Sequence, residues 1–366
     1  MDKSSYKFKS LEDKYKGFLA PAFEITVGSK KIDTTKIAVS SLTVDIDAGQ
    51  NAGGCSFTIE SQYDYEKRKW DNSLLKTIQV GAKLTIKAGY VSKKEIFFGF
   101  VDDYTITYSA DSAPALSVNG IDAKGYLMNA KDNKYMSEKS TAAVVKEILG
   151  ECVSKGYAKK VTVGTIKDFS AELVQEDMDD YRFLCYLAQN YHMSFFVVDG
   201  EMIFSDVMDN KKPILSLKLG VSLMSFSLTT SLKNKVGKVV VYGIDPVTLK
   251  PISGEASNSS DGDSGKEAGD IARGFNNTVQ KEVSYLAQTA EECKKLAQAR
   301  FDEIASTFVT GRGRCVGIPE LIPGRYIEVS GLDSGSNTRY FITKVTHEYT
   351  AEGYYTSFEV KGARLK

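Results

Sequence analysis

The stretch from Gln175 to Asp206 constrains the fold more than any other part of this chain. Its first half places apolar side chains at helical spacing: Phe183, Leu184, Leu187, Ala188 and Tyr191. That period predicts one amphipathic helix with a single buried stripe. Asp177 is the expected N-cap, and Asp179 and Asp180 place negative charge in the first turn, where the helix dipole favours it.

The second half of the same stretch predicts a β-hairpin. Ser194–Val198 is a continuous apolar run of the kind found in buried strands, and Met202–Ser205 is the expected partner strand. Asp199 and Gly200 lie between them, and an Asp-Gly pair favours a tight primed turn. This helix and hairpin contain no pattern typical of catalysis, so the unit is interpreted first as a structural part.

Length and charge limit the class of protein. A chain of 366 residues exceeds the usual size of a single core, so two or more domains are expected. Lys and Arg number 47 and Asp and Glu number 47, so the formal net charge is zero. This balance argues against nucleic-acid binding, which normally needs a basic surplus, and it suits a protein that works inside an assembly.

Targeting signals and cysteine chemistry give a consistent prediction of compartment. The longest apolar runs are too short to span a bilayer, and the N-terminus has no apolar signal core. We therefore expect synthesis in the bacterial cytoplasm without a signal peptide, and no stable membrane insertion. The cysteines are scattered and unpaired in spacing, which predicts buried free thiols rather than zinc ligands: Cys55, Cys152, Cys185, Cys293 and Cys315.

The rest of the chain reads as mostly β structure interrupted by helices. The expected strands are Phe23–Val27, Ile37–Ile46, Cys55–Glu60, Lys83–Ala88, Glu95–Tyr108, Leu116–Asn119, Ser216–Thr230, Lys238–Tyr242, Arg325–Ser330, Arg339–Tyr349 and Tyr354–Lys361. A further helix is expected over Thr141–Lys155, with Ser140 as its cap, and another over Thr289–Thr307.

Residues 253–270 differ in composition from everything around them. They contain no aromatic or β-branched residue and carry five acids against one lysine. Such a segment has little apolar surface to bury against its ordering entropy, so it is predicted to be a mobile acidic loop.

No catalytic, cofactor-binding or metal-binding residue is predicted. His192 follows a helix and His347 lies in an alternating strand, and neither context supports a catalytic triad. Asp261 and Asp263 suggest a calcium loop, but Lys266 and Ala272 occupy the positions that require Gly and Glu.

Two further patterns have simpler explanations than chemistry. Gly311 and Gly313 suggest a phosphate loop, but the next glycine is Gly317 and the stretch follows a helix, so a turn between helix and strand is expected. The carboxylates of Glu176–Asp180 are explained by helix capping rather than by an acid/base pair.

Several segments, in this order, resemble the phage late control D family, the baseplate hub proteins of contractile tails and contractile injection systems. They are Leu11–Phe18, Pro21–Ile25, Phe97–Val101, Val118–Asp122, Glu176–Phe204, Gly317–Gly324, Val329–Leu332, and the final hairpin residues His347, Gly353, Tyr354, Thr356 and Phe358. The Glu176–Phe204 unit is the most specific, and it is shared in outline with type VI secretion spike proteins. The resemblance covers essentially the whole chain.

The resemblance implies a mainly β fold with α/β elements: two tube-protein-like antiparallel β-barrels per chain plus helical connector domains. Mapped onto this sequence, an N-terminal extension spans residues 1–20, the first barrel 21–130 and an α/β helix–hairpin domain 131–210. The second barrel takes 211–252 and 308–366, and an acidic flexible loop plus helix takes 253–307.

The resemblance also implies a function without catalysis and without cofactors. Three such chains form a ring that joins the sixfold inner tube to the threefold central spike. The implied partners are two further copies, a separate spike protein, inner-tube or tube-initiator proteins, and tape-measure and LysM-type baseplate proteins. The parent particle can be a phage, a tailocin-like bacteriocin or a cellular injection machine. A tail-associated cell-wall hydrolase and a carbohydrate-binding receptor protein are the alternatives.

Overall fold

A computed structural model of the chain describes residues 4–60, 62–128, 130–136, 139–208, 210–260 and 265–365. The fold is mainly β with helices attached, as the sequence predicts. Most strands belong to one 13-stranded sheet, and the core is a continuous cluster of buried apolar side chains that runs through the β structure and the helices packed on it. No helix in the described part is long and apolar enough to cross a membrane.

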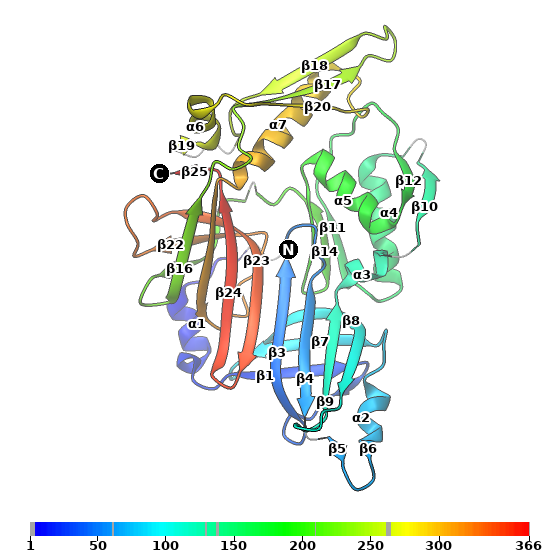
Figure 1. Ribbon diagram of the computed structural model, residues 1–366, viewed down its shortest axis with the longest axis vertical. Helices are drawn as coiled ribbons and strands as arrows, with labels where there is room; N and C mark the ends of the chain where they lie inside the picture. Colours follow the sequence, from blue (N-terminus) through cyan, green and yellow to red (C-terminus); the bar gives the residue numbers. More distant parts are fainter. Residues whose placement is uncertain are drawn as a thin grey trace.

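The large sheet consists of two β units. The first contains β1 (Ala22–Val27), β2 (Lys30–Lys31), β3 (Ala38–Asp47), β4 (Gly54–Glu60), β7 (Lys83–Gly89), β8 (Lys93–Thr107) and β9 (Ala115–Ile121). The second contains β15 (Pro213–Lys218), β16 (Leu223–Thr230), β21 (Val309–Val316), β22 (Tyr326–Ser330), β23 (Arg339–Thr350) and β24 (Gly353–Gly362). Figure 1 shows the two units side by side.

A seam of backbone hydrogen bonds joins the two units. β3 pairs with β23 in antiparallel fashion, with Val44 opposite His347. Polar side chains reinforce the seam, because Asp45 accepts from the hydroxyl of Thr346 at 2.6 Å and pairs with the ammonium of Lys344 at 3.0 Å. The two expected barrels are therefore joined edge to edge in one sheet, with strand order β16-β21-β24-β23-β3-β4-β9-β8-β7-β1-β2.

Two expectations in the second unit were wrong. The single strand expected over Ser216–Thr230 is two strands, β15 and β16, separated by a turn in which Gly220 has a φ of +76°. Gly311 and Gly313 lie inside β21, not in a turn. A Cβ on Gly313 would lie 2.2 Å from the ring of Phe358, so glycine is needed there for close packing across the sheet.

The helix–hairpin unit forms largely as its sequence predicts. It contains α3 (Ala123–Leu127), β10 (Asp132–Tyr135), α4 (Thr141–Ser154), β11 (Lys160–Val163), β12 (Val174–Met178), α5 (Asp180–Tyr191), β13 (Ser194–Val198) and β14 (Glu201–Ser205). Ser140 caps α4, and all five residues of the predicted α5 stripe are buried. Asp199 and Gly200 both have positive φ, as a primed hairpin turn requires.

The N-cap of α5 was assigned to the wrong aspartate. The Asp179 side chain accepts from the backbone N–H of Arg182 at 2.7 Å and caps the helix. Asp177 lies in β12, and its carboxylate pairs with Lys131 at 2.9 Å. The sequence alone does not show which of two aspartates, two residues apart, is the N-cap. The pairing of β12 with β10 decides it, because it places Asp177 in a strand.

A third group of elements lies at one end of the molecule (Figure 1). It contains β17 (Lys238–Ile244), β18 (Pro251–Ala256), β19 (Lys266–Glu267), α6 (Ala268–Phe275), β20 (Val279–Val283), α7 (Ala290–Ser306) and β25 (Arg364–Leu365). β17, β18 and β20 form a separate sheet packed on α7. Residues 238–252 were expected in the second barrel, and this placement was wrong because their partners are β20 and α7.

The prediction of a mobile loop over residues 253–270 was also wrong for most of that segment. Residues 253–256 belong to β18, and residues 266–270 form β19 and the first turn of α6. Residues 261–264 lie outside the described part, so the prediction is not tested there. The described part of the segment is held mainly by strand pairing with β17 and β25 and by polar side-chain contacts.

The N-terminal extension is folded onto the second β unit. It forms α1 (Phe8–Lys14) and a short 3-10 helix over Lys16–Phe18, and Leu11 and Tyr15 are buried. The Tyr6 backbone N–H donates to the carbonyl of Ile214 at 2.8 Å. At the end of the molecule opposite β17 and β18, the small hairpin of β5 (Tyr63–Asp64) and β6 (Lys69–Trp70) leads into α2 (Asn72–Thr77) (Figure 1).

Candidate functional site

A cavity of about 410 Å³ lies where the helix–hairpin unit, α7 and the second β unit meet. The C-terminal end of α5 and the residues after it contribute His192, Met193 and Phe195. The wall from β22 to β24 contributes Tyr326, Arg339, Tyr340, Phe341 and Lys361. α7 contributes Asp302, Glu303 and Ser306. Three segments that are far apart in the sequence therefore build one hollow.

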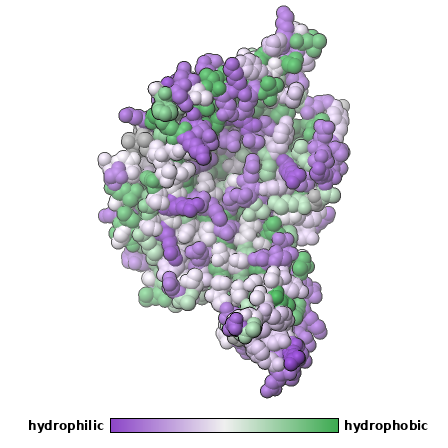
Figure 2. Space-filling model, viewed as in Figure 1, coloured by the Kyte–Doolittle hydropathy of each residue, from purple (hydrophilic) through white to green (hydrophobic). Residues whose placement is uncertain are grey.

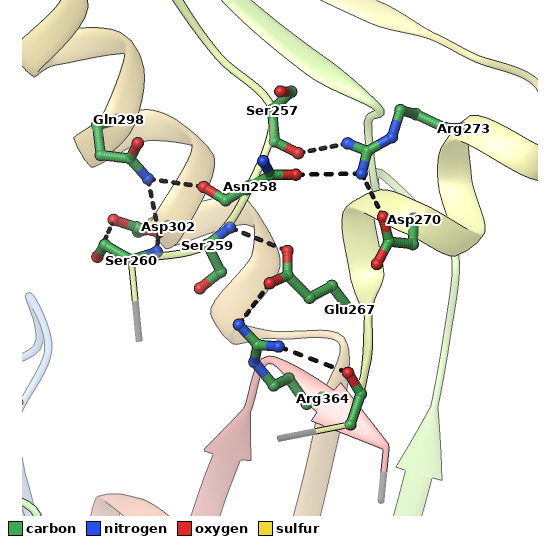
Figure 3. Close-up of polar contacts among 11 residues, drawn as sticks. Ser257, Asn258, Ser259, Ser260, Glu267, Asp270, Arg273, Gln298, Asp302 and Arg364 are labelled. Carbon is green, nitrogen blue, oxygen red and sulfur yellow. Dashed lines mark hydrogen bonds and ion pairs between the residues drawn. The ribbon is translucent and has the colours of Figure 1, made fainter. Parts of the chain in front are cut away.

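The described residues of the acidic segment fix one rim of this cavity (Figure 3). Asp302 accepts from the backbone N–H of Ser260 at 2.9 Å and from its hydroxyl at 2.6 Å. The Gln298 amide donates to the carbonyl of Asn258 at 2.9 Å. Because both acceptor and donor lie on α7, residues 257–260 are held against that helix.

Two arginines complete the network in Figure 3. The Arg273 guanidinium donates to the carbonyls of Ser257 and Gly237 and pairs with Asp270. The Arg364 guanidinium pairs with Glu267, whose other carboxylate oxygen accepts from the backbone N–H of Ser259 at 3.0 Å. The C-terminal strand and the acidic segment are thus tied together by charge beside the cavity.

Neither histidine has the surroundings of a general base. His347 is buried in the sheet, where its Nδ1 lies 3.0 Å from the hydroxyl of Tyr354 and 3.1 Å from that of Thr356. Burial lowers the pKa of His347 to about 3, so the ring is neutral. His192 is the C-cap of α5 in the left-handed conformation, with a φ of +55°, and it lines the cavity.

The thiol in the cavity is not activated. Cys185 lines the cavity together with His192, and burial raises the pKa of the Cys185 thiol. A protonated thiol is a poor nucleophile, so this arrangement disfavours cysteine chemistry. The five cysteines are free, as expected, and all but the partly buried Cys185 are buried.

Metal binding has no support in the described part of the chain, where His, Cys, Asp and Glu form no group of three that could hold an ion. The aspartates of the rejected calcium loop, Asp261 and Asp263, lie outside the described residues. The carboxylates of 176–180 include the Asp179 cap, and Asp180 accepts from the Gln175 amide at 3.0 Å.

The sequence did not predict the cavity or its basic residues. Lys361 was placed correctly in the last strand, and Arg339 at the start of another, but nothing in either position indicates a shared hollow. Their convergence follows from the pairing of β23 with β24, which sets Phe341 opposite Lys361. No sequence pattern would have found this site, because its walls come from three separate regions.

Two surfaces have the character of interfaces. Among the described strands, β16 and β2 at the two ends of the main strand order, and β15 on the branch through β22, each pair with a single strand and leave an open edge. The second surface lies in the sheet of β17, β18 and β20. The end of β17 and the loop that leads to β18 expose Ile244, Val247 and Leu249, and Val247 is 88% exposed. Hydrophobic residues are visible at that end in Figure 2.

The profile of the Alg8 N-terminal domain family matches residues 20–351. No protein among those with curated descriptions matches the sequence.

Solved structures share the fold at low sequence identity. A prophage MuSo2 43 kDa tail protein from Shewanella oneidensis is 15% identical, with a TM-score of 0.67 over 92% of this chain and 97% of that chain. A tail protein from Neisseria meningitidis is 12% identical, with a TM-score of 0.69 over 93% and 96%. A type VI secretion component from E. coli is 11% identical, with a TM-score of 0.56 over 92% and 76%. The resemblance to baseplate hub proteins is thereby confirmed for the fold.

Proposed function

The chain belongs to the Alg8 N-terminal domain family and has the fold of phage tail proteins, and from this premise we propose that it is the structural hub of a contractile-tail or injection-system baseplate. In this role three copies form a ring between the sixfold inner tube and the threefold central spike. The observation that carries the proposal is the match of the tail-protein fold over more than nine-tenths of the chain.

The internal organisation of the chain supports the symmetry of this proposal. Each chain carries two β units that are joined through β3 and β23. A ring of three chains therefore presents six such units to the tube. Toward the spike, the same ring has threefold symmetry because it contains three chains. A change from sixfold to threefold symmetry then needs no chemical step.

The open sheet edges support ring closure. β16 and β2 lie at opposite ends of the large sheet, so a contact between the β16 edge of one copy and the β1–β2 edge of the next is heterologous. Heterologous contacts close into rings when the rotation between copies allows it. Open edges also invite pairing with another chain, and a stable soluble protein normally covers them.

Sedimentation of the full chain, alone and with its spike protein, tests the proposal. We expect a trimer in at least one of these conditions. The double substitution Ser225→Glu and Ser227→Glu places charge on β16 and is expected to prevent assembly, whereas Ser109→Glu with Ser112→Glu, in an exposed loop, is not. A wild-type chain that stays monomeric in both conditions contradicts the hub role.

We further propose that the protein is not an enzyme. The buried neutral His347 and the protonated Cys185 support this, because neither can start acyl or glycosyl transfer. The proposed hub contributes contacts, and its partners are the spike and tube components of the same particle. Peptidoglycan degradation by the purified chain that is lost in His192→Ala without unfolding would contradict this part of the proposal.

A further inference from the structure

We propose that the cavity between α5, α7 and β23–β24 is a binding site for a carboxylate attached to an apolar body, with Lys361 as the residue that pairs with the carboxylate. This site is independent of the hub role and would remain if that role were wrong. The argument rests on a lining cation with no carboxylate partner among the described residues, on acids that are already engaged, and on an apolar wall.

Lys361 is a lining cation with no carboxylate partner among the described residues. Its side chain lines the cavity, and its ammonium lies 5.5 Å from the centre of the Phe341 ring. Within the part of the chain that the structure describes, no carboxylate lies within ion-pair distance of it. Burial lowers the pKa of Lys361, against a weaker opposing effect of Glu303. Even a partly buried ammonium without a counter-ion is costly, so a ligand carboxylate would relieve that cost.

The acids that line the cavity are engaged elsewhere. Asp302 holds Ser260 and accepts from the amide of Gln298 at 3.1 Å. Glu303 pairs with Arg300, three residues earlier on α7, at 3.3 Å. Asp206 accepts from the backbone N–H of Met208 at 3.0 Å. The acids of the lining are therefore engaged with partners other than Lys361.

Both arginines in the lining have partners of their own. Arg364 pairs with Glu267, and Arg339 donates to the carbonyl of Lys211 at 3.1 Å. The lining carries four basic residues, Lys211, Arg339, Lys361 and Arg364, and three acids, so its formal net charge of +1 favours a ligand with one negative charge over a dianion such as phosphate.

The walls of the cavity select an apolar body. Phe195, Tyr340 and Phe341 line it, together with the flexible side chains of Met193 and Met208. Aromatic and methionine side chains offer contact area to an apolar group without fixing its shape. The volume of about 410 Å³ lies within the range of small-ligand sites. The same chemistry is present in a small aryl or alkyl acid and in a glutamate flanked by apolar residues on a partner polypeptide.

Calorimetric titration of the full chain tests the site with two pairs of probes. The first pair is phenylpropionate and phenylpropionamide, and the second is acetyl-Leu-Glu-Leu-amide and its glutamine counterpart. We expect each binding probe to lose at least about tenfold in affinity when its carboxylate becomes an amide, as for a buried hydrogen bond to a charged group. The probe pair that binds identifies the source of the carboxylate.

Substitutions assign the effect to Lys361. Lys361→Met is expected to lower the affinity for the carboxylate probe by about tenfold and to leave the affinity for the amide probe unchanged. Lys361→Arg is expected to keep binding, and Lys281→Met, an exposed lysine on β20, is the matched control. The proposal is overturned if acid and amide bind equally, if neither carboxylate binds, or if Lys361→Met binds like the wild type. If Lys361→Met does not fold, the wild-type comparison of acid with amide decides.

Discussion

The helix–hairpin formed by α5, β13 and β14 and the segment 253–270 are ordered by different forces. The first is held by apolar burial, and Leu187 and Phe196 have no exposed surface. The second has almost no apolar side chains and is held by Arg273, Gln298, Asp302 and Arg364. Low hydrophobicity therefore predicted disorder for a segment that is fixed by polar contacts.

This contrast shows where composition stops being informative. Apolar periodicity is written locally, so a helix that buries one face can be recognised from its own residues. Polar anchoring depends on partners that lie elsewhere in the sequence, and two partners of residues 257–260, Gln298 and Asp302, lie about forty positions away on α7. Three measurements can break or sharpen the contrast, and they are given in order of expected effect.

Leu187→Ala should have the largest effect. Its side chain is fully buried in the α5 stripe, so truncation removes burial and leaves a cavity. We expect a loss of roughly 2–5 kcal/mol in the free energy of unfolding, measured by urea denaturation. Gln189→Ala, on the exposed face of the same helix, is the control and should change little. A negligible shift for Leu187→Ala would mean that apolar burial does not hold this unit.

Arg273→Ala should act more locally. It removes the donor to the carbonyls of Ser257 and Gly237, and we expect a loss of roughly 1–3 kcal/mol in the protection of residues 257–260 and α6. Hydrogen exchange measures this protection. Arg312→Ala breaks an exposed pair with Glu359 and should cost less than about 1 kcal/mol. Unchanged protection at residues 257–260 would show that the arginine does not anchor the segment.

Acidification should have the smallest effect, and it should distinguish α7, to which the acidic segment is anchored, from the apolar helix–hairpin. Burial alone would raise the pKa of Glu292, but hydrogen bonds from Gln288, Ser170 and Thr289 outweigh it and lower that pKa. A carboxyl with a lowered folded pKa stabilises the fold above its ordinary pKa, and this stabilisation is lost as the pH falls through the folded value.

The expected loss at the start of α7 is below about 1 kcal/mol, because Glu292 is partly exposed. Exchange measured at pH about 6 and about 3 should show it at Ser170 and the first turn of α7, and Glu292→Gln should abolish the difference. Equal acid sensitivity around Leu187 would remove the proposed distinction between α7, which anchors the acidic segment, and the apolar helix–hairpin.

The sequence predicted most elements of the fold and none of the cavity. Ser140 as the cap of α4, the buried α5 stripe and the Asp199–Gly200 turn could be read from a few neighbouring residues. The break between β15 and β16 could not, because only the pairing of β15 with β22 and of β16 with β21 separates them. Residues such as Lys361 gained their significance from side chains more than fifty positions away.

The sequence by itself determined the mainly β class, the amphipathic helices and the hairpin, because side-chain periodicity and turn chemistry act over short distances. The tertiary structure alone decided which strands join, that β3 and β23 fuse the two β units, and that the acidic segment is anchored to α7. It also decided that Lys361 lies beside the Phe341 ring at the wall of the cavity. Long-range pairing satisfies backbone and charged groups through partners that no local pattern specifies.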